Sequence, residues 1–149
     1  MELITACHDT TLHHTIYTKF MLTSDAAGSQ TGVDRPDWAQ GTFFAGLDPT
    51  TLYKRETQRT TMTVLLGSAA LAEQYIHLTN DYFLSKGHLV AKADFLYGAQ
   101  QMSTFWYSNA APQWQTFNGN NWNALENDCR SFAGRLGADL EVYTGTYVN

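Results

Sequence analysis

Residues 81–94 read Asp81-Tyr-Phe-Leu-Ser-Lys-Gly-His88-Leu-Val-Ala-Lys-Ala-Asp94, and the interpretation of the whole chain depends on this stretch. Short apolar segments, 82–84 and 89–91, flank the histidine, and the glycine before it permits a tight backbone. A neutral imidazole is a good general base near pH 7, because its unperturbed pKa is close by. An isolated histidine in an apolar setting is usually structural. The residues that follow therefore decide whether His88 is a catalytic base.

Two amides and a carboxylate follow His88. Asn109 ends the aromatic-rich segment 104–109, which is typical of a strand that stops at Pro112. Asn118 precedes a helix that is predicted to begin near Asn121, and Glu126 lies on that helix. An apolar stripe at helical spacing supports the helix and predicts its buried face: Trp122, Leu125, Cys129, Phe132 and Leu136.

A histidine after a glycine, followed by two amides and a carboxylate at these intervals, resembles the DNA/RNA non-specific endonucleases with a ββα-metal site. The resemblance is strongest to secreted arthropod members, including those that degrade double-stranded RNA. It implies an α+β fold, with an antiparallel sheet and packed helices, and one nuclease domain over residues 1–149 that is a fragment of a longer architecture. It also implies hydrolysis of phosphodiesters in DNA and RNA with Mg²⁺, or alternatively Mn²⁺, and it implies secretion.

The resemblance assigns a role to each polar residue. His88 matches the general base, and Asn118 matches the asparagine that ligates the metal directly. Glu126 would orient metal-bound waters, and Asn109 would position groups around the phosphate. Arg130, one turn after Glu126, would bind substrate and pair with that carboxylate, because the two are four residues apart on the helix.

Two more cations are expected at the phosphate. Lys86 stands where the family usually has arginine, in a motif that reads Ser-Lys-Gly-His; lysine lacks the bidentate fork and predicts a reduced rate or an altered substrate preference. A second cation is expected from the N-terminal part. Arg35 fits the family's order best, and Arg55 and Arg59 compete with it.

Structural interpretations compete with these roles. Asn118 could cap the following helix, since asparagine is favoured there, and Glu126 could be solvated. His8, His13 and His14 are predicted to be structural or solvated, because their setting offers no ligand geometry. Four tryptophans could stack bases, although most are expected in the core: Trp38, Trp106, Trp114 and Trp122.

The rest of the chain predicts five elements. A strand is expected over residues 12–22, alternating apolar and polar from Ile16 onward. A helix should open at Asp48-Pro49 and stop at Gly67, and a second should begin at Ser68. A helical turn is expected over 93–101, and a last strand over 139–146.

Composition limits the function classes. The chain has 149 residues, 44% of them hydrophobic, which suits one folded domain. The net charge of −5, from 9 basic and 14 acidic residues, argues against a protein that coats nucleic acid with a broad basic surface. No apolar run approaches the roughly 20 residues of a membrane span, so no membrane partner is expected. No exposed apolar stripe indicates an oligomer, and the sequence leaves the oligomeric state unknown.

Further alternatives remain open at this point. Cys7 and Cys129 could form a disulfide or remain thiols. The N-terminal residues 1–7 lack the basic and apolar regions of a signal peptide. The alternative to a nuclease is a catalytically weakened member of the family that binds nucleic acid or protein, and a third possibility is a structural fragment without activity.

Overall fold

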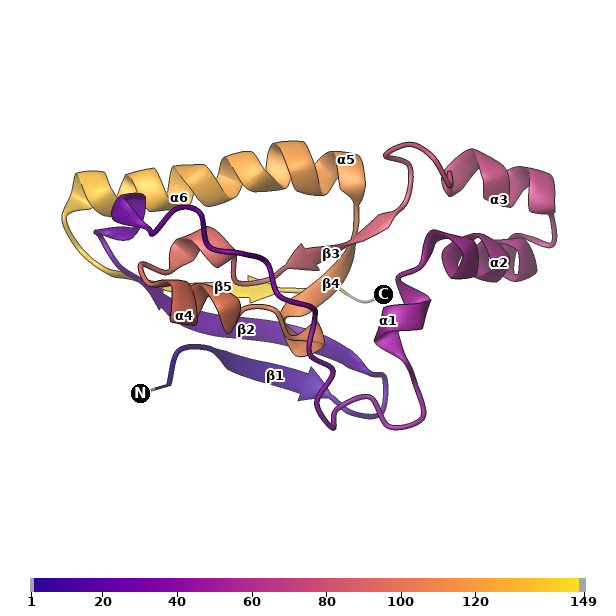
Figure 1. The fold of residues 1–149 in the computed structure, drawn as a ribbon, viewed down its shortest axis with the longest axis horizontal. Coiled ribbons are helices and arrows are strands. Elements are labelled where there is room, and N and C mark those ends of the chain that lie inside the picture. Colours follow the sequence, from indigo (N-terminus) through magenta and orange to yellow (C-terminus); the bar gives the residue numbers. More distant parts are fainter. Residues whose placement is uncertain (1, 148–149) are drawn as a thin grey trace.

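The computed structural model describes residues 2–147 and has the expected mixed α+β fold (Figure 1). One antiparallel sheet has the strand order β1-β2-β5, and β3 and β4 form a separate antiparallel hairpin. A long helix, α6, lies along the sheet (Figure 1). The strands and the long helix have these bounds: β1 Thr5–Asp9, β2 His14–Leu22, β3 Leu84–His88, β4 Ala110–Trp114, β5 Leu140–Gly145 and α6 Asn123–Leu136.

The central strand β2 supplies the core. Thr18, Phe20 and Leu22 are buried, whereas the neighbouring Tyr17 and Met21 are exposed, as strand alternation requires. Phe20 and Leu22 pack in one buried cluster with four other side chains: Ala26, Val90, Phe95 and Ala133. The cluster joins the sheet to α6 and to the segment that follows β3.

The expected helix from Asp48 to Gly67 is divided in two. The Asp48 carboxylate caps α1 (Pro49–Leu52) by accepting from the Thr50 amide at 3.0 Å, and α2 (Arg55–Leu66) starts anew after a break. At the break, the Tyr53 carbonyl accepts from the Gln58 side chain at 3.0 Å. The same amide also binds both backbone groups of Leu84, and so anchors α2 to the start of β3.

The second predicted helix start is confirmed. Gly67 ends α2 with a left-handed φ of 64°, and the Ser68 hydroxyl caps α3 (Ala69–Tyr75) by accepting from the Leu71 amide at 3.3 Å. Together α2 and α3 form an arm that projects beyond the β3–β4 hairpin (Figure 1).

The predicted apolar stripe of α6 is not its buried face. Leu125, Phe132 and Leu136 are 50–56% exposed, whereas Arg130 and Ala133 are buried. Arg130 forms an ion pair with Asp94 beneath the helix, and this contact turns the face that carries Arg130 and Ala133 inward. The exposed apolar side chains also correct the expectation that the chain shows no such stripe.

The segment expected as a strand over 104–109 is irregular and ends in a 3₁₀ turn, η3 (Tyr107–Asn109). The strand β4 begins only at Ala110 and continues through Pro112, which lies opposite Lys86. Proline is tolerated there because β4 pairs on one side only. Short helical elements fill the connections: η1 Ala26–Gly28, η2 Lys92–Asp94, α4 Gly98–Met102, α5 Gln115–Phe117 and η4, a π turn, Asn118–Trp122.

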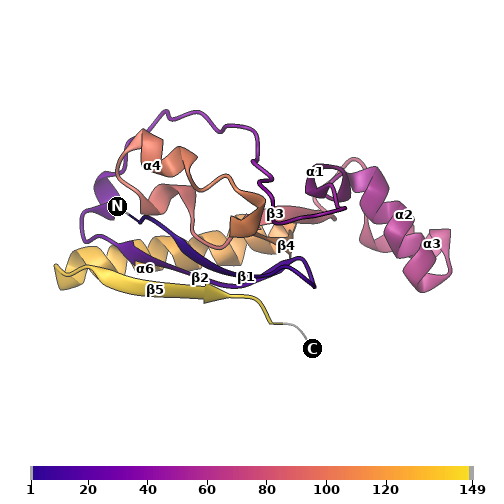
Figure 2. The same ribbon diagram turned by 90° about the horizontal axis from the view of Figure 1, so that it is seen from below.

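A long irregular segment, residues 29–47, is called the strap below. Figure 2 shows it running past α4 on its way from η1 to α1. The Gln30 amide donates to the Leu96 carbonyl at 2.8 Å, and Ala39 bridges to the residues around Trp106. These bonds fix the strap to the segment that connects β3 with β4.

Cys7 and Cys129 are both free thiols, which settles the alternative left open by the sequence. Within residues 2–147, no helix combines the length and the apolar character that crossing a bilayer requires.

Candidate active site

His88 is the last residue of β3 and lies in an aromatic cage. Its ring centre is 4.6 Å from that of Trp38 in the strap and 4.9 Å from that of Phe105, which stands perpendicular to it. The side chain is 7% exposed. Burial lowers the pKa of His88 to about 3, and the positive charges of Arg35 and Lys92 contribute. The imidazole is therefore neutral at neutral pH, as a general base must be.

Two polar contacts hold His88. Its Nε2 atom lies 3.3 Å from the Thr104 hydroxyl oxygen. Its backbone carbonyl accepts from the Trp122 indole at 3.3 Å. Trp122 precedes α6, so this bond connects the end of β3 to the start of the long helix.

Basic side chains lie on the same side of the hairpin as His88. Lys86 is two residues before it and so faces the same way; its Nζ is 5.7 Å from the ring centre of Trp38 and 5.6 Å from that of Tyr107. The Cζ of Arg35 is 5.3 Å from the ring centre of Phe105. The strap thus brings Arg35 to the cage around His88.

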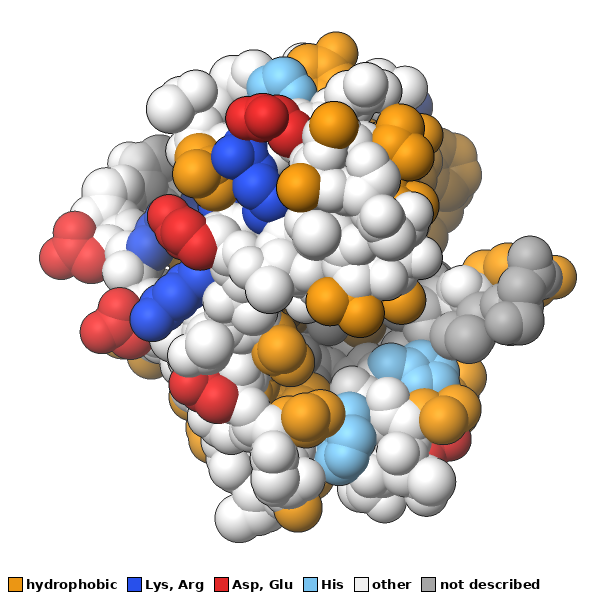
Figure 3. Space-filling view, turned by 90° about the vertical axis from the view of Figure 1, so that its right-hand side faces the viewer, with side chains coloured by type: hydrophobic (Ala, Val, Ile, Leu, Met, Phe, Trp, Pro, Cys, Tyr) orange, Lys and Arg blue, Asp and Glu red, His pale blue; other side chains and the backbone are white. Residues whose placement is uncertain are grey.

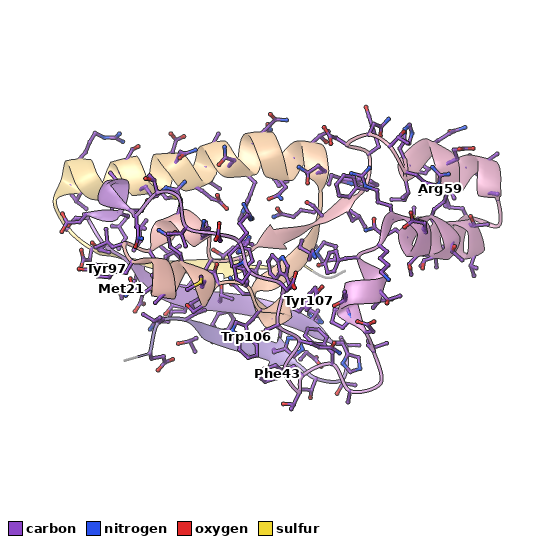
Figure 4. The ribbon with its side chains drawn as sticks, viewed as in Figure 1. Met21, Phe43, Arg59, Tyr97, Trp106 and Tyr107 are labelled. Carbon is purple, nitrogen blue, oxygen red and sulfur yellow. The ribbon has the colours of Figure 1, made fainter. Side chains whose placement is uncertain are left out.

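The two competing arginines lie elsewhere. Arg55 donates to the Leu78 carbonyl at 2.9 Å, and Arg59 donates to the Ile76 carbonyl at 2.9 Å and pairs with Glu73. Both side chains therefore tie α2 to residues 73–78. Figure 4 shows Arg59 on the projecting arm, away from Tyr107 at the hairpin.

The opposite face of β3 carries a second polar group. The Asn118 amide nitrogen donates to the Ser85 hydroxyl at 3.1 Å, and that hydroxyl donates to the Gln113 carbonyl at 3.0 Å. Asn118 has helical backbone angles inside the run from α5 to α6, so it does not act as the N-cap of α6. Its Oδ1 atom makes no hydrogen bond within residues 2–147 and is free to ligate.

Gln113, which was not among the predicted metal ligands, adds a further oxygen. Its Oε1 atom is enclosed and has no hydrogen-bond partner among the described residues. It fills the space over Gly87, where a Cβ atom would lie 2.3 Å from it. The glycine is therefore required by this side chain, since its own φ is not in the left-handed region.

The donor set suits a hard cation. Asn118 offers an amide oxygen, which Mg²⁺ accepts as a ligand, and Mg²⁺ retains several waters and needs few protein ligands. Glu126 lines a separate cavity with Asp94, Trp122 and Cys129. In the part of the chain that the structure describes, no three His, Cys, Asp or Glu side chains gather closely enough to hold a metal. A metal here would therefore rely on amide oxygens and water.

Glu126 and its neighbours differ from the expected pairing. Arg130 forms its ion pair with Asp94 and donates to Asn127 at 2.9 Å, rather than pairing with Glu126. Burial raises the pKa of Glu126 to about 7, and the charge of Asp94 adds to this, while Arg130 opposes it. The Glu126 carboxyl can therefore exchange a proton near neutral pH.

Asn109 is placed differently from its predicted role. It is 3% exposed, and both amide hydrogens are donated to backbone carbonyls, those of Val90 and Thr104, at 3.0 and 2.9 Å. Its Oδ1 accepts from the Val90 amide at 3.0 Å. No amide hydrogen is left for a phosphate, and the side chain instead ties the segment after His88 to Thr104.

The N-terminal histidines lie outside this group. His8, His13 and His14 line a cavity of about 410 Å³ between the β1–β2 turn, α1 and the hairpin. Figure 3 shows histidine and hydrophobic side chains beside a hollow on this side of the molecule. Burial lowers the pKa of His8, and the charges of His13 and His14 add to the effect.

The chain is similar in sequence to three salivary proteins. A salivary endonuclease of Lutzomyia longipalpis is 44% identical over 63 residues, which cover 42% of this chain and 15% of that protein. Salivary protein Tsal2A of Glossina morsitans morsitans is 30% identical over 104 residues, covering 69% of this chain and 25% of that protein. Salivary protein Tsal1 of the same fly is 38% identical over 66 residues, 44% of this chain and 16% of the relative. The chain thus matches a quarter or less of the length of these relatives.

A solved structure supports the fold. The complex of EndoG with its inhibitor EndoGI contains a chain that superposes with a TM-score of 0.63 and 22% identity, over 97% of this chain and 51% of that one. At this identity the likeness concerns the fold alone. The family model for DNA/RNA non-specific endonucleases matches residues 1–149, and the chain therefore belongs to the DNA/RNA non-specific endonuclease family.

Proposed function

We propose that this chain forms the site of a metal-dependent, sequence-non-specific endonuclease that hydrolyses phosphodiester bonds in DNA and RNA, including double-stranded RNA. The observation that carries the proposal is His88: a histidine kept neutral by burial, at the end of a strand, beside Arg35 and Lys86. A neutral histidine can take a proton from water, and the two cations can bind the phosphate that the water attacks.

The candidate base and the candidate metal ligand contact different faces of β3. His88 and Lys86 contact Trp38 on one face, whereas Ser85 binds Asn118 on the other. Displacement at phosphorus is in line, with the attacking and leaving oxygens on opposite sides. For this mechanism, His88 and Asn118 would have to reach opposite sides of one phosphate bound beside β3.

Asn118 is the residue we assign to the metal, through its free Oδ1 atom. Mg²⁺, or Mn²⁺ in its place, would supply positive charge to the leaving oxygen when it is bound. Glu126 is assigned to the metal-bound waters, because a carboxyl with a pKa of about 7 can accept or return a proton. Arg130 would act only through the carboxylates beside it.

The alternative is a binding module that no longer cuts. Lysine at position 86 favours it, because lysine lacks the bidentate fork with which arginine holds phosphate. The relatives named as salivary proteins also suggest secretion for the protein to which this chain belongs.

The test is cleavage of supercoiled plasmid and of double-stranded RNA, with Mg²⁺, with EDTA, and with the His88→Ala variant. We expect cutting that requires the metal and is lost in His88→Ala, while the variant stays folded and unfolds at a somewhat lower temperature, because a buried ring has been removed. Wild-type cutting by His88→Ala would contradict the assignment of the base. A folded chain that shifts nucleic acid on a gel in EDTA, but never cuts it, would favour the binding module.

A further inference from the structure

Thr104 is a buried residue between α4 and η3, with no exposed surface, and its hydroxyl oxygen lies 3.3 Å from Nε2 of His88. We propose that Thr104 is a positioning residue that fixes the tautomer of His88, keeping the proton on Nε2 and presenting an unprotonated Nδ1 to water. The consequence for catalysis rests on the function proposed above, whereas the tautomer itself does not.

The Thr104 hydroxyl lies near two groups that could accept its hydrogen, the Gln101 carbonyl and the His88 imidazole. A threonine hydroxyl has one hydrogen to donate and two lone pairs to accept with. The Gln101 carbonyl lies 2.8 Å from Oγ1, half an ångström closer than the imidazole. A carbonyl can only accept, so the hydroxyl hydrogen points to Gln101. Only a lone pair of Oγ1 then faces His88.

The imidazole must therefore be the donor in this contact. A neutral histidine carries its proton on one ring nitrogen only, and the hydrogen bond that one nitrogen makes decides which. With Nε2–H donated to Thr104, Nδ1 holds the free lone pair. Nδ1 makes no hydrogen bond within residues 2–147, and it is not among the enclosed side-chain atoms that lack a partner. Water can thus reach the nitrogen that must accept its proton.

Thr104 is itself held so that its hydroxyl cannot turn away. Its amide donates to the Gln101 carbonyl at 3.2 Å, and its carbonyl accepts from Asn109 at 2.9 Å. The side chain of Gln101 is 2% exposed and donates to the carbonyls of Gln30 and Phe95, both at 3.0 Å. These bonds anchor the turn to the strap on one side and to the segment after His88 on the other.

The ring of His88 has no freedom to compensate. Trp38 and Phe105 pack against it at 4.6 and 4.9 Å. A flip that exchanged the two nitrogens would require this cage to open. The tautomer is therefore the property that a change at Thr104 should alter first.

The experiment compares Thr104→Val with Thr104→Ser. Valine matches the shape of threonine and removes the acceptor, whereas serine retains it. Thr18→Val is the matched control, because Thr18 is another threonine without exposed surface and contacts Thr144 instead of His88. Thermal unfolding monitors the fold of each variant. The imidazole ¹⁵N shifts of His88 report the tautomer, and plasmid cleavage with Mg²⁺ reports the rate.

The expected result is an Nε2–H signal for His88 in the wild type, in Thr104→Ser and in Thr18→Val. In Thr104→Val part of the population should carry the proton on Nδ1. The kcat should fall roughly two- to tenfold in Thr104→Val, in proportion to the fraction of His88 that carries its proton on Nδ1, with KM unchanged, and serine should recover most of this loss.

Two outcomes would overturn the proposal. An Nδ1–H signal in the wild type contradicts the hydrogen assignment, and an unchanged tautomer or kcat in Thr104→Val contradicts the positioning role. If Thr104→Val fails to fold, the wild-type spectrum and the serine variant still decide. If the wild type does not cut at all, the proposed function fails while the ¹⁵N shifts still test Thr104.

Discussion

His88 and Glu126 carry ionisable groups whose surroundings move their pKa values in opposite directions. Burial lowers the pKa of the imidazole to about 3 and raises that of the carboxyl to about 7. Both shifts favour the neutral form, as removal from water does for any ionisable group. Near neutral pH the site therefore holds an unprotonated imidazole and a carboxyl that is partly protonated. The lowered pKa also makes this imidazole a weaker base than free histidine, whose pKa lies nearer the working pH.

The buried imidazole predicts acid sensitivity of the fold. The unfolded state binds a proton with a pKa near 6.5, but the folded state does so only near 3, so the stabilisation is present above pH 6.5 and is lost as the pH falls toward 3. We expect His88 to account for a loss on the order of 3 kcal/mol between pH 7 and pH 4. Urea unfolding at both pH values checks this for the wild type and His88→Gln.

The His88→Gln variant should lose correspondingly less stability on acidification, because glutamine does not titrate. An equal loss in both proteins would mean that other groups cause the acid unfolding.

Replacing Lys86 by arginine is expected to make cleavage more efficient. Its Nζ lies between the rings of Trp38 and Tyr107 as a point charge, whereas a guanidinium could hold two phosphate oxygens at once. We expect Lys86→Arg to raise kcat/KM for plasmid cleavage by roughly fivefold, about 1 kcal/mol of transition-state binding. Lys54→Arg, exposed before α2, is the control and should change nothing. A Lys86→Arg variant at or below the wild-type rate would show that the site is built for lysine.

At the level of elements, the β3–β4 hairpin depends on a contact across its two strands. A Cβ atom on Gly87 would lie 2.3 to 2.7 Å from three side-chain atoms of Gln113. We expect Gly87→Ala to cost roughly 1–3 kcal/mol of unfolding free energy, the usual effect of overpacking. Chemical denaturation measures it, with Gly28→Ala as the control, because nothing lies within 4 Å of a Cβ there.

The double variant Gly87→Ala with Gln113→Ala separates this contact from backbone effects. Truncating Gln113 removes all three clashing atoms, so alanine at position 87 should cost less than half as much in that background. The same cost in both backgrounds would place the strain in the backbone of β3.

The elements that the sequence predicted well are those with local signals. Asp48 and Ser68 cap their helices as expected, and Gly67 ends one. The break after α1 and the inward face of α6 could not be predicted, because each depends on a side chain whose partner is distant in sequence: Gln58 with Leu84, and Arg130 with Asp94. The spacing of hydrophobic residues predicts a helix, but it does not predict which face of the helix a buried ion pair will turn inward.

The site shows the same division. The order of its motifs singled out His88, Asn118 and Glu126 as candidates, and the resemblance favoured Arg35 over two other arginines. The spacing of residues in the sequence could not show that the side-chain amide of Asn109 binds backbone groups. It could not show either that Thr104 contacts the imidazole of His88. Those contacts exist only once the strap and the turn at 104–109 are folded against the hairpin.

Over the whole molecule, the charge is unfavourable for nucleic acid. The chain carries a net charge of −5, and on the face in Figure 3 acidic side chains lie next to basic ones. Phosphate contacts must therefore be few and confined to the site. The protein would depend on local cations rather than on a basic surface that holds the polymer along its length.

This distribution of charge predicts a weak salt dependence of binding. Each phosphate that a cation neutralises on duplex DNA contributes about −0.9 to the slope of log K against log salt, so binding through Arg35 and Lys86 should give a slope near −2. Fluorescence anisotropy of a labelled duplex, with the inactive His88→Ala variant in Mg²⁺ between 50 and 200 mM salt, measures it. Arg35→Ala in the same background should reduce the slope by about one, whereas Arg59→Ala on the projecting arm should leave it unchanged. A slope of roughly −6 or steeper would mean that a broad surface, and not the cage around His88, holds the nucleic acid.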